Sequence, residues 1–361
     1  MRGKEMKFNK FLGVTAGLVF TAVLANAGVV SFTCDATIDA TQAGTCAYLN
    51  GTVAGYYSSA FSNANASIYI QMGITGLGSS TTGFYNDLSY STYLSDLTSH
   101  SGGDTVDIDA LAALNSKDTA IYANDDVVIT SALGEALGVP NASLAGTTAG
   151  GSSCTIGAAG CYNGIITITT PANLLSETGQ TLYWDQTGGS IGGNAYDFYT
   201  IVQHETDEIL GTSSCISTQT NPNLTNPCAS NFGAGTPSAV DLFRYSASGN
   251  LLPDSALSTT PGQYFSYNGG AANGADGATY NTLDNGDDYA DFATNCAHVQ
   301  DAQGCTGAIF NITSDGGAEI NILDAVGYNQ NLQQSPAPEP GTIFLFGTGV
   351  AGLAIYRRRR A

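Results

Sequence analysis

The chain has 361 residues, and its 30 acidic residues outnumber its 10 basic residues, which gives a formal net charge of −20. Eight of the basic residues and two of the acidic ones lie near the two ends, which leaves 28 acidic and two basic residues between them. So acidic a chain repels phosphate backbones and anionic membrane surfaces. The composition therefore argues against nucleic acid as a partner and favours a soluble, exported protein.

Residues 1–27 have the layout of a secretory signal peptide. Basic residues are followed by the apolar run FLGVTAGLVFTAVLA and by Ala25, Asn26 and Ala27, an A-x-A cleavage pattern. The alternative is an N-terminal membrane anchor, but the run is short for a span of about 20 residues. We therefore expect residues 28–335 to form a single exported domain with long loops.

All eight cysteines lie in this exported region, where oxidation is expected. Their sequence alone does not fix the connectivity. They nevertheless occur as close neighbours, so we expect local disulfides that each close a short loop. The expected pairs are Cys34 with Cys46, Cys154 with Cys161, Cys215 with Cys228, and Cys296 with Cys305.

The apolar residues that follow predict a mixture of strands and helices. Ile68, Ile70 and Met72 alternate with Tyr69 and Gln71, which is the pattern of a half-buried strand. We expect further helices at residues 89–100, 108–114 and 127–137, and a buried strand at residues 164–169, GIITIT.

The stretch YTIVQHETDEILG is the most informative in the chain. We expect its helix to begin at Asp197, which suits the positive end, and to end at Gly211. His204 and Glu208 are four residues apart and share one helical face. In the zinc-peptidase pattern H-E-x-x-H, such a pair binds the metal and the intervening Glu is the general base. Because zinc also accepts carboxylate oxygen, we expect His204 and Glu208 to be metal ligands and Glu205 to be the base.

The alternative for this stretch is an acidic, solvated helix face with an incidental histidine. Against it, the same helix carries an apolar stripe, and charged groups beside a core are costly unless they are paired or bound. A carboxylate in place of a histidine makes the site harder. A harder site favours manganese or calcium more than a three-histidine site does. Zinc is the expected ion, with manganese and calcium as alternatives.

A catalytic zinc site usually has three protein ligands, so one more is needed. We favour His298, because the expected disulfide between Cys296 and Cys305 would hold its loop rigidly. His100 and a carboxylate such as Asp241 are the alternatives. For both histidines, an exposed position without a ligand role is also open.

Two other features of the exported region concern charge. The segment LDNGDDYADF at residues 283–292 gathers four aspartates around a glycine, so it is either an oxygen cage for calcium or a solvated acidic turn.

Arg244 is one of only two basic residues in the exported region. We expect it to pair with a carboxylate near the site.

The C-terminal end has three parts in a fixed order. Pro338, Glu339 and Pro340 precede an apolar segment at residues 341–356, and four arginines follow it. Over residues 336–361 this order resembles the PEP-CTERM sorting signal of Gram-negative bacteria. The resemblance implies recognition by an exosortase-type membrane protease and delivery to the cell surface or extracellular matrix. It also implies a transmembrane helix at residues 341–356 that anchors the chain only until the tail is processed.

From Val53 to Gly211 the order of segments resembles the matrixin-type zinc peptidases of the metzincin group. The matching segments are ASIYIQMGI, ALGEALGV, GIITIT and the helix DFYTIVQHETDEILG. The family signature H-E-x-x-H-x-x-G-x-x-H corresponds here to His204, Glu205, Glu208, Gly211 and Ser214. Two of its histidines are replaced, and no methionine follows the helix. The resemblance implies a zincin-like α+β fold with a mixed sheet, a central active-site helix and a loop-rich C-terminal part.

Two functions are compatible with these observations. The first is an exported metal-dependent peptidase that cleaves peptide or protein substrates. The second is a non-catalytic acidic protein of the surface or extracellular matrix that keeps the zincin-like scaffold.

Overall fold

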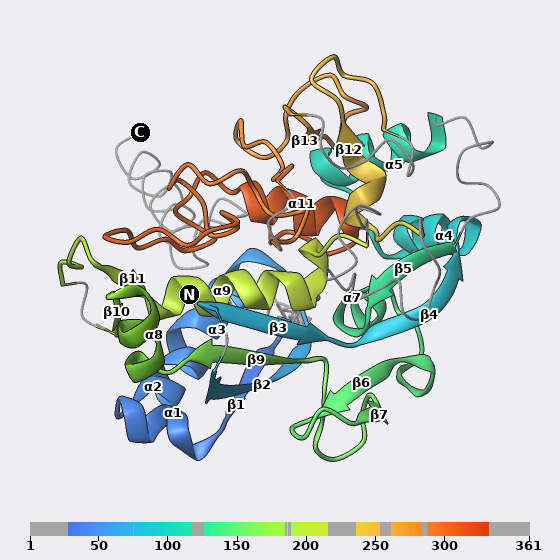
Figure 1. Cartoon of the computed structure of the whole chain (residues 1–361). Coiled ribbons are helices and arrows are strands. Elements are labelled where there is room, and N and C mark those ends of the chain that lie inside the picture. Colours follow the sequence, from blue (N-terminus) through green and yellow to red (C-terminus); the bar gives the residue numbers. More distant parts are fainter. Residues whose placement is uncertain are drawn as a thin grey trace, which may run out of the picture.

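The structure is a computed structural model that describes residues 28–74, 76–116, 126–184, 186, 189–215, 236–252, 261–283 and 287–331 (Figure 1). These residues form an α+β fold built on a mixed sheet. In that part of the chain, every helix is too short or too polar to cross a bilayer. The expected signal peptide and the expected transmembrane helix at residues 341–356 lie outside the described residues.

The main sheet has four strands in the order β1-β2-β9-β3. β1 (Val30–Cys34), β2 (Ala66–Gly73) and β9 (Gly164–Thr169) run parallel, while β3 (Gly78–Thr82) is antiparallel to β9 and forms one edge. A strand covered on both faces carries a continuous apolar run, and β9 does so. The alternating residues of β2 and the run of β9 confirm the two predicted strands.

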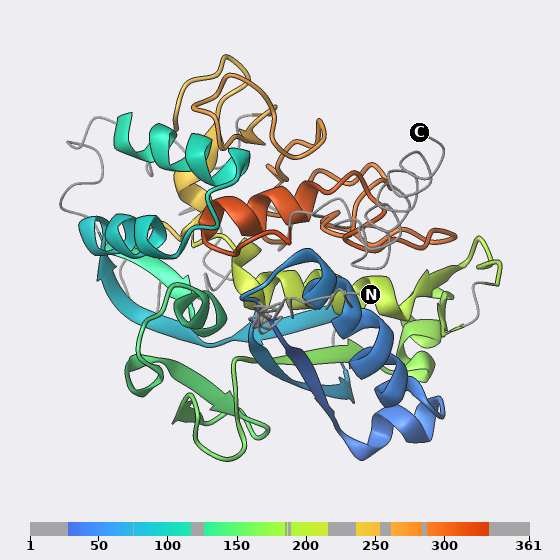
Figure 2. The same ribbon diagram turned by 180° about the vertical axis from the view of Figure 1, so that it is seen from behind.

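Helix α9 (Phe198–Asp207) lies against β3 and β9 and continues as one π-helical turn, η3 (Glu208–Thr212). In Figures 1 and 2 it lies between the main sheet and α11 (Ala318–Val326), which contacts η3. The helix predicted from Asp197 to Gly211 is therefore confirmed, and it is central to the fold.

The remaining elements are short and surround this centre. Among the described residues the small sheets pair β4 (Phe84–Ser89) with β5 (Asp126–Thr130), β6 (Ala145–Thr148) with β7 (Ser153–Thr155) and β8 (Cys161–Tyr162), β10 (Thr181–Tyr183) with β11 (Ala195–Asp197), and β12 (Arg244–Tyr245) with β13 (Tyr264–Phe265). The other helices are α1 (Ala36–Thr41), α2 (Thr45–Tyr48), η1 (Leu49–Val53), α3 (Ala54–Ala60), α4 (Tyr90–His100), α5 (Thr105–Ser116), α7 (Ser131–Ala136), η2 (Asn141–Ser143), α8 (Pro171–Thr178) and η4 (Val240–Phe243).

The helix predicted at residues 127–137 is wrong in its first part. Residues 126–130 form strand β5, because their β-branched side chains favour extended backbone. Helix α7 starts only after Thr130, whose hydroxyl accepts a hydrogen bond from the Leu133 amide at 3.0 Å. That N-cap marks the boundary that periodicity alone does not detect.

Three of the predicted disulfides are confirmed. Bonds join Cys34 to Cys46, Cys154 to Cys161, and Cys296 to Cys305. The fourth prediction involves Cys228, which lies outside the described residues.

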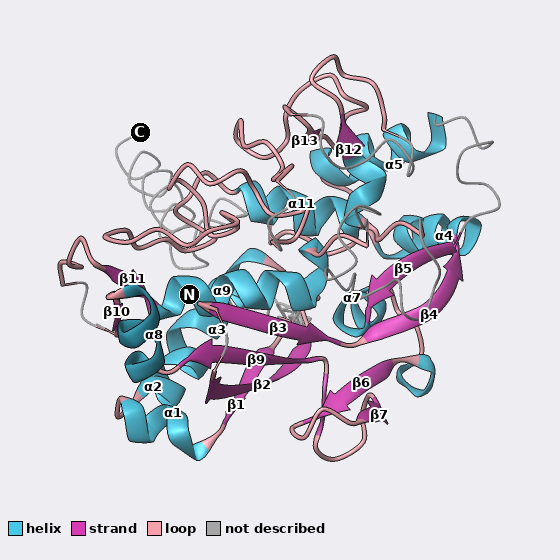
Figure 3. Ribbon diagram, viewed as in Figure 1, coloured by secondary structure: helices cyan, strands magenta, loops and turns pink. Residues whose placement is uncertain are grey.

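The segment between β12 and α11 is rich in loops, as Figure 3 shows. Hydrogen bonds to α9 hold it in place. The Phe310 amide donates to Thr200 Oγ1 at 2.9 Å, and the Ile312 amide donates to Gln203 Oε1 at 3.2 Å. These bonds bring residues that are about a hundred positions away in sequence onto the central helix.

Candidate metal centre

The helix that carries the HETDE sequence is fixed at both ends. The Asp197 carboxylate caps it by accepting from the Thr200 amide at 2.7 Å, and the apolar stripe of Phe198, Ile201 and Val202 is buried. At the other end Gly211 adopts φ 135°, a conformation that favours glycine. One side of α9 is therefore anchored in the core, which leaves His204 and Glu208 together on a partly exposed face.

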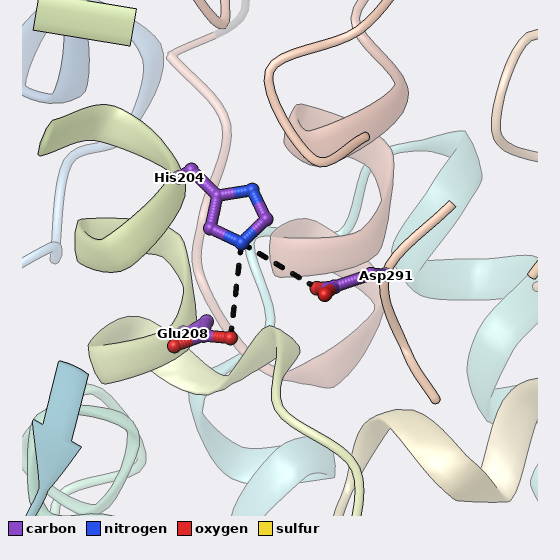
Figure 4. A group of neighbouring side chains, drawn as sticks. All are labelled: His204, Glu208 and Asp291. Carbon is purple, nitrogen blue, oxygen red and sulfur yellow. Dashed lines mark ion pairs between the residues drawn. The ribbon is translucent and has the colours of Figure 1, made fainter. Parts of the chain in front are cut away.

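The ring of His204 is oriented by the loop that packs over α9. Its Nδ1 donates to the carbonyl oxygen of Val299 at 3.0 Å. In the neutral tautomer this bond leaves the lone pair on Nε2. Nε2 faces two carboxylates, with Glu208 Oε1 at 3.9 Å and Asp291 Oδ1 at 3.7 Å (Figure 4). A carbonyl partner on the far nitrogen is the usual support of a metal-binding histidine.

The distances within this group decide what can connect its members. N–H···O hydrogen bonds extend to about 3.2 Å, so the two separations from Nε2 are too long for direct bonds. Two ligands at about 2.1 Å from one tetrahedral ion lie roughly 3.4 Å apart. His204, Glu208 and Asp291 each offer one donor atom within 4.8 Å of the others. The three donor atoms are therefore close enough together to contact one cation.

Asp291 is the third member of the group. The sequence placed it in an acidic segment that is either a calcium cage or a solvated turn, and not beside His204. It lies in the acidic segment at residues 283–292 and is buried, with an exposed fraction of 3%. The Gln300 side-chain amide donates to its Oδ1 at 2.9 Å, and the Gln300 backbone amide donates to Glu319 Oε1 at 2.9 Å. Asp291 therefore does not belong to a solvated turn, which was one of the two alternatives for this segment. The clustering of aspartates was the signal that could have found it.

Glu205, the expected base, is buried next to the group. Burial and the negative charges of Glu208 and Asp291 raise its pKa well above the usual range. The backbone amide of Ser80, in β3, donates to Glu205. The Ser80 hydroxyl donates to Glu208 Oε2 at 2.5 Å. The edge strand therefore orients both carboxylates.

The other candidate ligands lie elsewhere. His298 is buried, its ring packs edge-on against Phe292 with centroids 5.2 Å apart, and it does not belong to the group around His204. His100 is the exposed last residue of α4. Asp241 accepts hydrogen bonds from the Ser238 amide and hydroxyl. The structure therefore brings together His204 and Glu208 of the predicted ligands and places Asp291 beside them, while His298 lies outside this group.

Ser214, at the position of the third signature histidine, has a structural role. Its hydroxyl donates to Asp241 Oδ1 at 2.6 Å, and its amide donates to Asp288 Oδ1 at 2.9 Å. Arg244 pairs with the same Asp241 at 3.4 Å and lies 3.9 Å above the Tyr280 ring. The predicted pairing of Arg244 with a carboxylate is confirmed. This network stabilises the chain where it leaves the C-terminal end of the central helix.

The group opens into a pocket of about 450 Å³. The side of β3 forms one wall, with Leu77, Gly78 and Ser79. The wall also includes seven acidic side chains: Asp197, Glu205, Glu208, Asp287, Asp288, Asp291 and Asp301. No lysine or arginine lines the described part of this pocket. It therefore attracts cations and has room for a small part of a substrate.

Comparison with known proteins gives a match only for the C-terminal tail. The family model of the PEP-CTERM protein-sorting motif matches residues 336–360. The tail is a PEP-CTERM sorting motif. The chain is therefore an exported protein, and its tail is of the kind that exosortases recognise. No curated protein and no solved structure matches the chain significantly, so the likeness to matrixins stays at the level of sequence segments.

Proposed function

We propose that this protein is an exported metal-dependent hydrolase of peptide bonds, with the cation held by His204, Glu208 and Asp291. One observation carries the proposal. The Val299 carbonyl turns the His204 ring so that Nε2 faces two carboxylates across gaps of 3.7 and 3.9 Å at the mouth of a pocket. An ion pair of a charged histidine would draw these atoms closer together.

The donor set fits a borderline or hard divalent cation. One imidazole nitrogen and two carboxylate oxygens suit zinc, and the excess of oxygen also suits manganese. Three protein ligands leave room for a water or a substrate atom, as catalytic sites require. Zinc is the ion we propose first, because the imidazole is oriented for it.

The side chains around the group supply the other parts of hydrolysis. When bound, the metal would lower the pKa of a coordinated water and polarise a carbonyl. Glu205 would accept the proton of the attacking water and pass it to the leaving amine. Burial and the charges of Glu208 and Asp291 raise the pKa of Glu205, which favours the uptake of a proton. Gln300 keeps Asp291 in place while this happens.

The proposed substrate class follows from the edge strand. β3 lies at the edge of the main sheet and lines the pocket. An extended peptide can add to such an edge through main-chain hydrogen bonds. A peptide bound there would pass Glu205 and the cation. We therefore propose unfolded segments of proteins as substrates.

The first experiment measures metal content. Wild-type protein, purified with any chelator removed, should hold one equivalent of zinc or manganese by elemental analysis. His204→Ala should lose it, because the imidazole is the only nitrogen donor. His100→Ala is the matched control, since this exposed histidine lies on α4, away from the pocket. Equal metal content in both variants would contradict the ligand assignment.

The second experiment tests catalysis. Digestion of a peptide library by the wild type should fall by a factor of about 10² to 10⁴ in Glu205→Gln, the range for a general base. Metal content should stay unchanged. Glu177→Gln, an exposed carboxyl on α8, is the control. Bound metal without any digestion in the wild type would leave the second function, a non-catalytic acidic surface protein.

A further inference from the structure

A second group of carboxylates lies where helices α5 and α11 meet. Asp104 precedes α5, Asp107 is in its first turn, and Asp324 is in the last turn of α11. One oxygen of each lies within 4.8 Å of the others. Figure 2 shows the two helices side by side, and they are in contact. None of these residues lines the pocket at His204.

Two of these side chains are deeply buried and incompletely bonded. Asp107 is 1% exposed and Asp324 is 0% exposed. Asp107 Oδ2 accepts from the Gly103 amide at 2.7 Å, and Asp324 Oδ1 accepts from the Gln330 amide at 3.2 Å. The other oxygen of each carboxylate, Asp107 Oδ1 and Asp324 Oδ2, is buried without a hydrogen-bond partner. Buried polar atoms are rarely left in this state unless something is bound to them.

No side chain of the described residues supplies a positive charge here. Arg244 is the only lysine or arginine among them, and it pairs with Asp241. Asp324 also lies at the negative end of the α11 dipole, which disfavours an anion. The group therefore lacks a positive partner within the described chain.

The side chain of Asn329 lies close to Asp107. Asn329 Oδ1 is buried without a hydrogen-bond partner. A Cβ atom at Gly102 would lie 3.3 Å from Asp107 Oδ2 and 3.5 Å from Asn329 Cγ, so the two side chains are neighbours. An amide oxygen next to carboxylates is a common combination in calcium sites.

We propose that Asp104, Asp107 and Asp324 bind a calcium ion that joins α5 to α11. All the donors are oxygen atoms, which suits calcium, whereas zinc prefers nitrogen and sulfur donors. Extracellular calcium sites typically bind with dissociation constants of roughly 10⁻⁴ to 10⁻³ M. This inference does not depend on the proposed peptidase activity.

The site would stabilise the end of the folded domain. Directly after α11, the Asn329 amide donates to Asn63 Oδ1 at 2.6 Å, and the Asn331 amide donates to the Ala60 carbonyl at 2.7 Å. These bonds attach the end of the described chain to the region of α3. A cation at Asp324 would hold this end, which stops five residues before the sorting motif begins at residue 336.

The test is calcium binding by the full-length protein after removal of bound ions with EGTA. Calcium should raise the melting temperature in a saturable way by several degrees. Asp324→Asn and Asp107→Asn should each reduce that rise to less than a fifth. Asp109→Asn is the control, because it makes the same change on the same helix outside the group. The response should persist in His204→Ala, which separates this site from the one on α9.

Three outcomes would overturn the inference. These are no saturable rise in the wild type, an equal rise in the Asp324→Asn and Asp109→Asn variants, and loss of the rise in His204→Ala. If Asp324→Asn does not fold, Asp107→Asn carries the comparison. If neither folds, the calcium response of folded His204→Ala decides, together with equilibrium dialysis that counts one bound calcium per chain.

Discussion

The N-cap of the central helix provides a sharp test of how burial acts on this fold. Asp197 is 3% exposed, and its Oδ2 accepts from the amide and the hydroxyl of Thr200 at 2.7 and 2.8 Å. Burial raises the pKa of Asp197 from 3.8 to about 6 despite these bonds. We therefore expect Asp197→Asn, which keeps a capping oxygen, to change how stability depends on pH.

The direction follows from proton linkage. The folded state holds the proton of Asp197 more tightly than the unfolded state does. Its contribution to stability is therefore full below pH 3.8 and is lost as the pH rises through about 6. At 1.36 kcal/mol per pH unit, the loss is roughly 3 kcal/mol. Relative to the wild type, Asp197→Asn should gain about that much unfolding free energy between pH 3.5 and 7.

Urea denaturation at both pH values measures this difference directly. Asp109→Asn, which lies on α5 away from the central helix, serves as the control and should show no such trend. A difference between Asp197→Asn and wild type that stays constant from pH 3.5 to 7 would refute the reasoning. It would mean that the hydrogen bonds from Thr200 outweigh the cost of burying the charge.

Two further predictions concern residues that support the site. Gln300→Leu removes the amide that holds Asp291, so metal affinity measured against a chelator should fall by about 10- to 100-fold while the protein stays folded. An unchanged affinity would show that Asp291 needs no such support. Arg244→Met leaves Asp241 buried without its countercharge, so the unfolding free energy in urea should fall by about 3 to 5 kcal/mol. A change within 0.5 kcal/mol would show that the hydrogen bonds to Asp241 suffice.

Features governed by local geometry could be predicted from the sequence. Helical spacing placed His204 and Glu208 on one face, and the structure has them there. Alternation identified β2, and closeness along the chain identified three disulfides. The boundaries between helices and strands were harder to predict from the sequence. The apolar run of β5 is short, so its spacing does not separate a strand from a helix. The N-cap of helix α7 at Thr130 marks where the strand ends.

The third donor and the orientation of the first were decided by the tertiary structure. Asp291 and Val299 lie more than eighty residues beyond His204, and only the docking of the C-terminal loops on α9 brings them to it. No spacing rule reaches that far, because irregular loops have no fixed period along which side chains recur. For the same reason the sequence could not show that Asp291, and not His298 seven residues further on, lies beside His204.

The sequence by itself determined export, the sorting tail, the acidic character and the helix that presents a histidine and a carboxylate side by side. These depend on composition or on contacts within one turn of backbone. The tertiary structure decided which distant carboxylate joins them and which way the imidazole points. It also decided that acidic residues from α5 and α11 meet in the interior. Those outcomes depend on how loops and helices pack, and packing is set by the whole core at once.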